Sequence, residues 1–246
     1  MRRWNSRCGA VALYHTDCFD FLAGCPAGAF SAVVTDPPYG STDCRWDKPF
    51  DLARWWQLVD RATSPAAVVA SFAAQPFATN LINSNRKAFR YELVWKKTRP
   101  VGFLNANRQP LRDHELIVVF CRRPGRSIYH PQKTPGKPYH TKNHGKANVY
   151  ARHERCETIN HGDRHPRSVL AIDEPGRGRW HPTQKPVALC EWLVRSYTSP
   201  GDTVVDPFAG SCSTALACLA SGRRFVGCER DPKNFRRAVE RLQAAK

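Results

Sequence analysis

Long apolar runs are missing from this sequence. No stretch approaches the roughly 20 residues that a membrane-spanning helix needs, and the first residues lack the apolar segment of a signal peptide. The 10 cysteines include no C-x-x-C pair, and a disulfide framework is not expected in a chain of this size without a secretory signal. Internal repeats and coiled-coil heptads are also absent. We therefore expect a soluble, cytoplasmic protein with reduced thiols and no membrane partner.

Negative charge is scarce as well. The chain has 21 Asp and Glu against 38 Lys and Arg, which gives a formal net charge of +17. Such an excess favours a polyanionic partner, most often nucleic acid. The alternative is a ribosome-associated or simply basic protein. Hydrophobic residues make up 41% of the 246 residues, enough to bury a core and to exclude a wholly disordered chain.

Short apolar runs alternate with helical patterns, which predicts an α/β fold. Strands are expected at Val11–His15, Ala32–Thr35, Ala67–Ser71, Tyr91–Trp95, Leu116–Cys121, Thr203–Val205 and Phe225–Cys228. Helices are expected at Asp51–Ala62, Pro76–Asn83, Val187–Tyr197, Ser213–Ser221 and Lys233–Gln243. Only a long polar loop separates the Tyr91–Trp95 and Leu116–Cys121 strands, so this pair is expected to be antiparallel at a sheet edge.

Residues 122–179 have a different composition. They are rich in Arg, Lys, His, Pro and Gly, and they contain six of the nine histidines. Because apolar residues are few, we interpret the segment as a basic recognition insertion outside the sheet that becomes ordered against its partner. A zinc site is the alternative, although paired cysteines are lacking. The ligand types for zinc stand at His140, His144, His153, Cys156, His161 and His165.

The most informative motif is Thr35-Asp36-Pro37-Pro38-Tyr39-Gly40, which directly follows an apolar run. It places an acid, two prolines and an aromatic ring at the carboxyl end of a strand, where open α/β sheets bind ligands. An aromatic amine is a poor nucleophile because its lone pair is delocalised into the ring. The Asp36 carboxylate and the Pro37 carbonyl can accept its two hydrogens, which suits methyl transfer to an exocyclic amine stacked on Tyr39. The alternative is a Pro-Pro turn that only closes a βα unit.

A second motif runs from Asp202 to Thr214. An apolar strand ends in Asp206, a turn of small residues follows, and a helix opens with Ser213 as its expected N-cap. The turn lacks the G-x-G-x-x-G spacing of NAD-binding folds. Glu229, at the end of the next apolar run, is in position to hold ribose hydroxyls. These features predict a cofactor with a nucleoside but no pyrophosphate, and the alternative is a purely structural βαβ corner.

With both motifs in view, the sequence resembles the β group of S-adenosylmethionine-dependent amino-methyltransferases that act on DNA. In that family a D-P-P-Y catalytic half comes first, a target-recognition region follows, and a D-P-F-x-G-S-G cofactor half comes last. Two positions depart from the family pattern, which has Gly in place of Thr16 and of Cys212, so the second turn must avoid or tolerate a positive φ. The matching segments are Asp17-Cys18, Asp36–Tyr39, Trp95-Lys96, His114–Phe120, His181–Pro186 and Asp206–Ser211.

The resemblance implies roles for individual residues. Catalysis falls to Asp36, Pro37, Pro38 and Tyr39. Contacts with S-adenosylmethionine fall to Asp17, Cys18, Asp36, His181, Thr183, Lys185, Asp206, Pro207, Phe208, Ala209, Gly210, Ser211 and Glu229. Two basic clusters are expected to contact DNA, with Phe103 available to stack: Lys96, Lys97, Arg99, Arg108 and Arg112 in one, Lys137, Lys142 and Lys146 in the other. The alternative for the first cluster is a solvated loop. No metal ion is expected.

The implied fold is a Rossmann-like, seven-stranded methyltransferase sheet in circularly permuted order. Residues 1–124 would form its catalytic half, 125–178 the target-recognition insertion and 179–246 its cofactor half. The acid at Asp36 favours site-specific N6-adenine methylation of a flipped-out base. Cytosine-N4 methylation, a catalytically silent DNA-binding protein of the same fold, and methylation of RNA or protein are the alternatives. Double-stranded DNA is the expected partner of a bacterial or phage protein, with a homodimer and a cognate restriction endonuclease left open.

Overall fold

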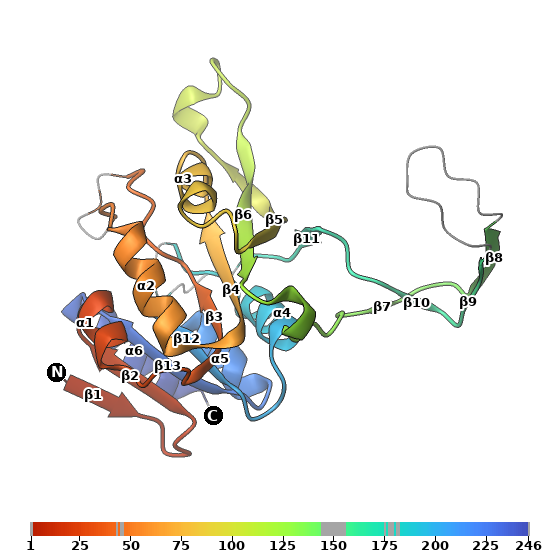
Figure 1. Cartoon of the computed structure of the whole chain (residues 1–246). Coiled ribbons are helices and arrows are strands. Elements are labelled where there is room, and N and C mark those ends of the chain that lie inside the picture. Colours follow the sequence, from red (N-terminus) through yellow and green to blue (C-terminus); the bar gives the residue numbers. More distant parts are fainter. Residues whose placement is uncertain are drawn as a thin grey trace. The chain divides into compact units, whose positions relative to one another are not determined.

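The computed structural model describes residues 2–42, 44, 47–143, 156–174, 176, 180 and 183–245. The chain divides into two compact units, Met1–His130 with Ser168–Lys246, and Pro131–Arg167. The larger unit is an α/β fold built on one sheet, and the smaller unit consists of short antiparallel ribbons (Figure 1). None of the helices in these described ranges is long and apolar enough to cross a bilayer.

The larger unit contains a nine-stranded sheet with the order β1-β2-β13-β12-β3-β4-β6-β5-β11. The strands from β2 to β4 in this order are parallel, whereas β6 is antiparallel to both of its neighbours. The last two strands of the chain therefore lie inside the sheet, between β2 and β3. The bounds are β1 Arg2–Asn5, β2 Val11–His15, β3 Phe30–Thr35, β4 Thr63–Ala73, β5 Phe89–Val101, β6 Arg112–Cys121, β11 Val169–Ala171, β12 Thr203–Asp206 and β13 Arg224–Glu229.

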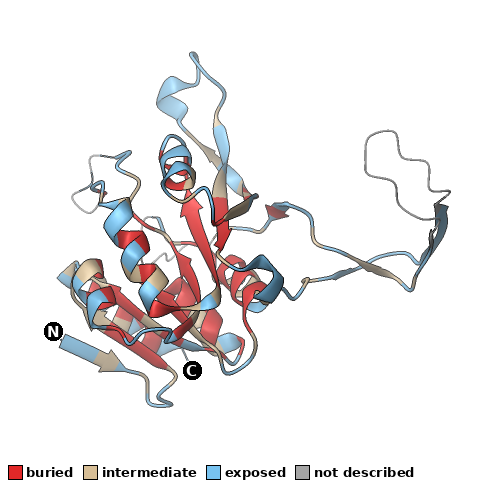
Figure 2. Cartoon of the chain, viewed as in Figure 1, coloured by how far each residue is buried: buried red, intermediate tan, exposed pale blue. Residues whose placement is uncertain are grey.

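Helices cover both faces of the sheet, because neighbouring strand residues point to opposite sides. Val34 and Val204 belong to a core shared with α4, α5 and α6, whereas Val33 and Val205 belong to a second core shared with α1, α2 and α3. Figure 2 shows the buried residues along the central strands and on the helix faces turned toward them. The helices are α1 Cys18–Gly24, α2 Leu52–Ala62, α3 Phe77–Ser84, α4 Val187–Tyr197, α5 Ser213–Ala220 and α6 Pro232–Ala244.

Side-chain caps define where several helices begin. Asp17, Asp51 and Asp231 each accept a hydrogen bond from a backbone N–H in the first turn of α1, α2 and α6. The expected cap at Ser213 is wrong, since Cys212 holds the cap position of α5 and no side chain caps that helix. Cys212 has a φ of +59°, so the turn tolerates a left-handed non-glycine residue at a cost on the order of 1 kcal/mol.

All seven expected strands are present, and β5 and β6 pair in antiparallel fashion as expected. This pair is not at the sheet edge, however, because β11 pairs in parallel with β5. The interpretation of residues 122–179 as wholly outside the sheet is therefore wrong at Val169–Ala171. The sheet has nine strands instead of seven because β1 and β11 extend its two edges. Strands of three or four residues carry too little alternation to be recognised.

The smaller unit has strand pairing of its own. Its strands β7 Thr134–Pro135 and β10 Asp163–Arg164 form one ribbon, and β8 Tyr139–Asn143 and β9 Cys156–Asn160 form another. The Asn160 side chain accepts hydrogen bonds from the N–H groups of Gly162 and Asp163, and the Arg164 guanidinium lies 4.7 Å from the centroid of the Tyr139 ring. The described part of the predicted insertion therefore contains local strand pairing of its own.

Gly227 in β13 leaves no room for a side chain. A Cβ there would lie 2.6 Å from Cζ of Phe225 and 2.7 Å from the Asp206 carbonyl oxygen. Gly227→Ala is therefore expected to lower the free energy of unfolding by about 1–3 kcal/mol through overpacking, as measured by urea unfolding. Gly24→Ala in α1, with nothing within 4 Å of the added Cβ, is the control and should stay within about 1 kcal/mol of wild type. Equal stabilities of the two variants would contradict the steric argument.

Candidate active site

Carboxylates gather where the central parallel strands end. Asp206 and Glu229 are the last residues of β12 and β13, while Asp36 directly follows β3 and Asp17 comes shortly after β2. Because β2, β13, β12 and β3 are parallel neighbours, their carboxyl ends meet at one edge of the sheet. The four acids predicted from the sequence therefore lie along the same edge.

A buried hydrogen bond joins the two central strands at this edge. The Thr35 hydroxyl donates to Asp206 Oδ1 at 2.7 Å across 171 positions of sequence, and the Phe208 N–H donates to the same oxygen at 3.0 Å. Burial raises the pKa of the Asp206 carboxyl to about 7, against the lowering effect of these two hydrogen bonds. Asp206 thus ties the turn after β12 to the residue that precedes Asp36.

Glu229 holds the turn that follows β12. Its carboxylate accepts hydrogen bonds from the N–H groups of Gly210 at 3.0 Å and of Asp231 at 2.7 Å. Burial raises the pKa of the Glu229 carboxyl although both hydrogen bonds lower it. Gly210 has a φ of +48°, in the left-handed region that favours glycine. A carboxylate has about four acceptor sites, so Glu229 can also accept hydrogen bonds from ligand hydroxyls.

Further contacts hold Pro207, Phe208 and Ala209, the first residues of this turn. The Cys228 thiol donates to the Pro207 carbonyl at 3.0 Å, and the Ala209 N–H donates to the Cys228 carbonyl at 2.9 Å. The Phe208 ring packs against the Phe50 ring with centroids 5.2 Å apart. Backbone and side-chain contacts therefore hold the predicted cofactor turn in one shape.

Arg241 of α6 supports the end of the same turn. It is 7% exposed, and its Nη1 donates to the carbonyl of Ser211 at 2.7 Å and to the hydroxyls of Ser211 and Ser213 at 3.1 Å. The Ser213 hydroxyl in turn donates to the Lys185 carbonyl at 2.7 Å. Sequence reasoning misses Arg241, because one more cation on an amphipathic helix gives no signal.

Asp17 and Cys18 lie at the start of α1. Asp17 Oδ1 accepts from the Phe19 N–H at 2.8 Å, and Oδ2 lies 3.7 Å from the Arg230 guanidinium. Cys18 is buried, and burial together with the Asp17 charge raises the pKa of its thiol to about 12. Asp17 therefore offers a partly exposed carboxylate at the sheet edge, and Cys18 contributes a neutral, apolar side chain.

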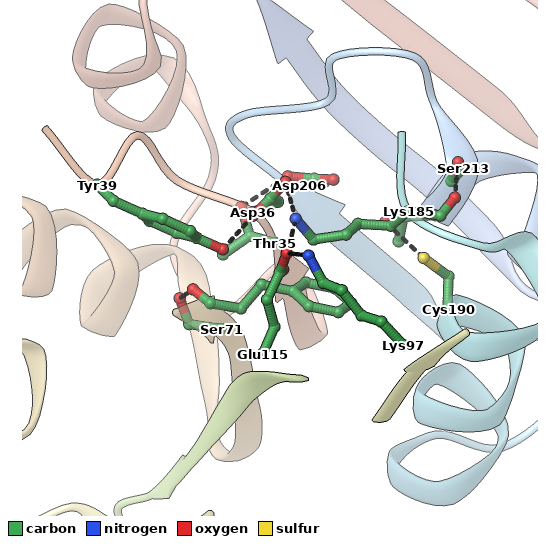
Figure 3. A network of polar contacts seen from close by, with 12 residues as sticks. Thr35, Asp36, Tyr39, Ser71, Lys97, Glu115, Lys185, Cys190, Asp206 and Ser213 are labelled. Carbon is green, nitrogen blue, oxygen red and sulfur yellow. Dashed lines mark hydrogen bonds and ion pairs between the residues drawn. The ribbon is translucent and has the colours of Figure 1, made fainter. Parts of the chain in front are cut away.

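Both oxygens of the Asp36 carboxylate have partners. The Tyr39 hydroxyl donates to Oδ1 at 2.6 Å, and the Lys185 ammonium lies 2.7 Å from Oδ2 (Figure 3). Between them in sequence, Pro37 is buried and Pro38 is half-buried. The loop after β3 thus brings the acid and the aromatic ring of the motif together.

The Lys185 ammonium lies between two carboxylates. Its second carboxylate is Glu115 Oε2 at 3.1 Å, and the other Glu115 oxygen forms an ion pair with Lys97. Burial lowers the pKa of Lys185, but Asp36 and Glu115 outweigh it and hold this pKa above its ordinary value. Burial raises the pKa of Glu115, but Lys185 and Lys97 outweigh it and hold this pKa below its ordinary value. Two cations and two carboxylates therefore balance one another (Figure 3).

This network bears on two sequence predictions. The predicted roles are cofactor binding for Lys185 and DNA contact for Lys97. Their side chains are only 9% and 10% exposed, and both are paired with carboxylates of the chain. Both ammonium groups therefore already have partners within the chain. Glu115 is a site residue that sequence reasoning misses, although an acid at the head of the apolar run Leu116–Cys121 is a visible signal.

Asp47 closes the loop that follows Tyr39. Its carboxylate, 3% exposed as a residue, accepts from the N–H groups of Gly40, Ser41 and Thr42 at 2.7, 2.9 and 2.8 Å and from the Thr42 hydroxyl at 2.7 Å. Burial alone raises the pKa of the Asp47 carboxyl, but these hydrogen bonds outweigh it and hold the pKa below its ordinary value. A single carboxylate therefore holds the backbone of residues 40–42, directly after the motif.

The β5–β6 hairpin carries the whole of the first basic cluster. Figure 1 shows the hairpin extending away from the helices of the larger unit. At its tip the short η1 helix Phe103–Asn105 exposes Phe103 by 67% and Leu104 fully. The exposed cations of the hairpin are Lys96, Arg99, Arg108 and Arg112.

The remaining predicted residues have varied positions. Thr183 is exposed. Lys137 and Lys142 are exposed in the smaller unit, where Lys142 lies 3.7 Å from Glu157. His140 also pairs with Glu157, and no group of three or more His, Cys, Asp or Glu in the described residues could hold a metal ion. The candidates that lie outside the described residues are His144, Lys146, His153 and His181.

Asp47→Asn is expected to lower the free energy of unfolding by about 1–3 kcal/mol at pH 7, because a neutral amide is a weaker acceptor for three N–H groups. The pKa of Asp47 in the folded protein lies below the unfolded value of about 3.9. The ionised carboxylate therefore stabilises the fold above about pH 3.9, and this stabilisation is lost as the pH falls through the folded pKa. Urea unfolding at pH 7, 5 and 3 should show the difference from wild type shrinking at the lowest pH. Asp20→Asn, at an exposed position, is the control. An unchanged difference at pH 3 would contradict the charge argument.

Comparison with known proteins agrees with this geometry. A family model described as DNA methylase, for N6 and N4 enzymes, matches residues 30–240. The DNA adenine methyltransferase YhdJ of Escherichia coli (strain K12) is 35% identical over 270 positions, covering 96% of this chain and 84% of that protein. Of the solved structures, the M1.HpyAVI–SAM complex has a TM-score of 0.68 at 23% identity, covering 94% of this chain and 98% of that one. PvuII DNA methyltransferase (cytosine-N4-specific) has a TM-score of 0.67 at 16% identity, with coverages of 96% and 86%. The chain belongs to the N6/N4 DNA methylase family.

Proposed function

We propose that this DNA methylase transfers a methyl group from S-adenosylmethionine to the exocyclic N6 of adenine, with the base flipped out of duplex DNA. The observation that carries the proposal is the loop after β3. It holds the Asp36 carboxylate and the Tyr39 ring together through a 2.6 Å hydrogen bond at the ligand-binding edge of the sheet. An acceptor and a stacking surface are the two groups that a flipped aminopurine needs.

The chemistry follows from the weakness of the target amine as a nucleophile. Asp36 and the Pro37 carbonyl accept its two hydrogens, which favours a pyramidal nitrogen with a localised lone pair. S-adenosylmethionine supplies a methyl group whose bond to sulfur breaks as the bond to nitrogen forms, the electron pair leaving with the sulfur. Asp36 then accepts the proton that the amine loses. No enzyme nucleophile is needed, so the cysteines have no covalent role.

The cofactor assignment is supported by the donors and acceptors at the ends of β2, β12 and β13. The Glu229 carboxylate accepts the ribose hydroxyls, and Asp17 accepts the adenine amine, which is the set of acceptors that an adenosine requires. Ala209 and Gly210 keep the turn free of bulky side chains where the ligand approaches. The remaining contacts fall to the turn itself at Asp206, Pro207, Phe208 and Ser211.

Adenine is proposed as the target because the motif begins with an acid at Asp36, and because the relative YhdJ is named as an adenine methyltransferase. Cytosine N4 is the second candidate. The observation that favours it is the TM-score of 0.67 to the cytosine-N4-specific PvuII enzyme, which has the same architecture at 16% identity. The two exocyclic amines present the same donors to Asp36, so the choice depends on the shape of the base.

We also infer that the sheet is circularly permuted. Its cofactor strands β12 and β13 come last in the chain yet lie between β2 and β3, next to the catalytic strand. Residues 1–124 and 179–246 then form two halves of one methyltransferase domain, and 125–178 form the target-recognition insertion. The small unit Pro131–Arg167 falls inside that insertion.

Methylation-sensitive sequencing of DNA from cells that express the chain tests the proposal. Wild type should leave N6-methyladenine at one recognition sequence. Asp36→Ala should lower turnover by about 100-fold or more, because the lost acceptor acts in the transition state. Cofactor binding, measured by calorimetry, should be largely retained, since Asp36 is only one of the many contacts predicted for the cofactor. N4-methylcytosine would select the second candidate, and unmodified DNA that the protein nevertheless binds would identify a silent DNA-binding protein.

Tyr39 provides matched variants for the same assay. Tyr39→Phe keeps the ring and should keep most of the activity, whereas Tyr39→Ala should lose it. Wild-type turnover in Asp36→Ala, or equal activity of the two Tyr39 variants, would contradict the proposed roles.

The exposed cations of the β5–β6 hairpin are proposed to contact DNA phosphates. In sequence they lie before and after the exposed Phe103 and Leu104. Cations can contact the phosphates while an exposed ring stacks on an unpaired base, which suits DNA with one base flipped out. Lys97 is left out of this surface, because its ammonium is paired with Glu115.

Replacing Arg99, Arg108 and Arg112 by Ala should weaken DNA binding and make its dependence on salt shallower, by a slope of roughly 2–3 in log–log form if all three contact phosphates. Fluorescence anisotropy between about 50 and 200 mM salt measures this slope. The control removes the same charge elsewhere, at the exposed Arg224, Lys233 and Arg236. An equal change of slope in both triple variants would mean that net charge alone explains the effect, and would contradict the proposed phosphate contacts of the hairpin.

A further inference from the structure

The Lys185 ammonium occupies the position that the proposed function gives to the target amine. Its Nζ lies 2.7 Å from Asp36 Oδ2, which is the acceptor proposed for the amine. The same Nζ lies 5.9 Å from the centroid of the Tyr39 ring, which is the stacking surface proposed for the base. A cation of the chain therefore makes both contacts that an incoming base would make.

An amine that binds where one of the two partners of Asp36 lies requires that partner to move. Tyr39 is the less mobile of the two, since its ring stacks on Phe77 with centroids 5.3 Å apart and planes at 23°. Lys185 has a flexible four-carbon stem, and its ammonium can turn while the stem stays packed. Lys185 is the partner that can leave.

Leaving Asp36 is costly for a buried ammonium unless a second acceptor stands nearby. Glu115 is that acceptor. Its Oε2 already lies 3.1 Å from Nζ. Its Oε1 is paired with Lys97, so the carboxylate is already held in position and charged. A small rotation of the ammonium from Asp36 toward Glu115 keeps Lys185 paired with a carboxylate, while Asp36 keeps the hydrogen bond from Tyr39 and gains those of the amine.

We propose that Lys185 holds the place of the target amine in the unloaded site and passes to Glu115 when the base enters, which makes Glu115 a positioning residue. The inference rests on the proposed function. The entering amine is neutral, so the two carboxylates and two ammonium groups stay balanced throughout. Lys97 holds the Glu115 carboxylate in position through their ion pair. Lys185 then pairs with Glu115 alone, and Asp36 can accept hydrogen bonds from the base.

Variants of Glu115 and Lys185, alone and together, are expected to differ in their rate of methyl transfer. Glu115→Gln removes the receiving charge and leaves Asp36 as the only carboxylate for Lys185. Single-turnover methylation should then slow by roughly 10- to 100-fold, the loss expected for one charge-assisted partner. Lys185→Met keeps the apolar stem but removes the ammonium that has to move, so it should be slowed less than Glu115→Gln. The double variant should be as fast as Lys185→Met and therefore faster than Glu115→Gln alone.

Three controls accompany the rates. Glu92→Gln removes the same charge from an exposed position on β5 and should not change the rate. The affinity for S-adenosylmethionine, measured by calorimetry, should be unchanged in Glu115→Gln and Glu92→Gln, which separates the effect of Glu115 from a loss of cofactor. Thermal unfolding shows whether each variant folds, and Glu115→Asp, which keeps a carboxylate, replaces Glu115→Gln should the latter fail to fold and should then be slowed less than tenfold.

Two results would overturn the inference. A double variant slower than Glu115→Gln alone would show that Glu115 acts independently of Lys185. A Lys185→Met protein that binds cofactor but transfers no methyl group would show that the ammonium takes part in the reaction itself. A wild-type chain that methylates no DNA would overturn the proposed function, and this inference with it.

Discussion

A buried ammonium group must be neutralised where it lies, and this requirement at Lys185 organises the candidate site. Its two carboxylates come from the loop after β3 and from the start of β6, while Lys185 itself precedes α4. Three segments that are far apart in the sequence therefore meet at the Lys185 ammonium. The Thr35–Asp206 hydrogen bond connects the end of β12 to the residue next to Asp36. The shape of the site follows from pairing charges and buried polar groups, which cannot be left unsatisfied in a low-dielectric interior.

The parts of the fold that could be predicted are those with a local pattern. β3 and β12 are apolar runs that end in acids, and α4 begins and ends at the residues its apolar spacing predicts. The strands β1 and β11 are too short for such a pattern, and α1 has only seven residues. These elements depend on neighbours supplied by the folded sheet, so no window of sequence contains their signal.

The same division holds in the site. Asp36, Asp206 and Glu229 follow apolar runs, and that placement predicts the edge at which they meet. The partners of Lys185 depend on β6 lying next to β4, which is a property of the sheet order. Asp47 acts through three backbone N–H groups, and backbone groups have no sequence signature. Residues that act on other residues are consequently harder to predict than residues that act on ligands.

The two edges of the sheet have a consequence for self-association. Unpaired strand edges invite pairing with a second molecule, and proteins avoid this with charges or with short covering strands. At one edge β1 exposes Arg2 and Arg3, whose guanidinium groups lie 6.0 and 5.3 Å from the ring centroids of Phe235 and Tyr14. At the other edge the short β11 pairs with the middle of the much longer β5. Charge at one edge and a short strand at the other are the two devices that oppose continuation of a sheet from one copy into another.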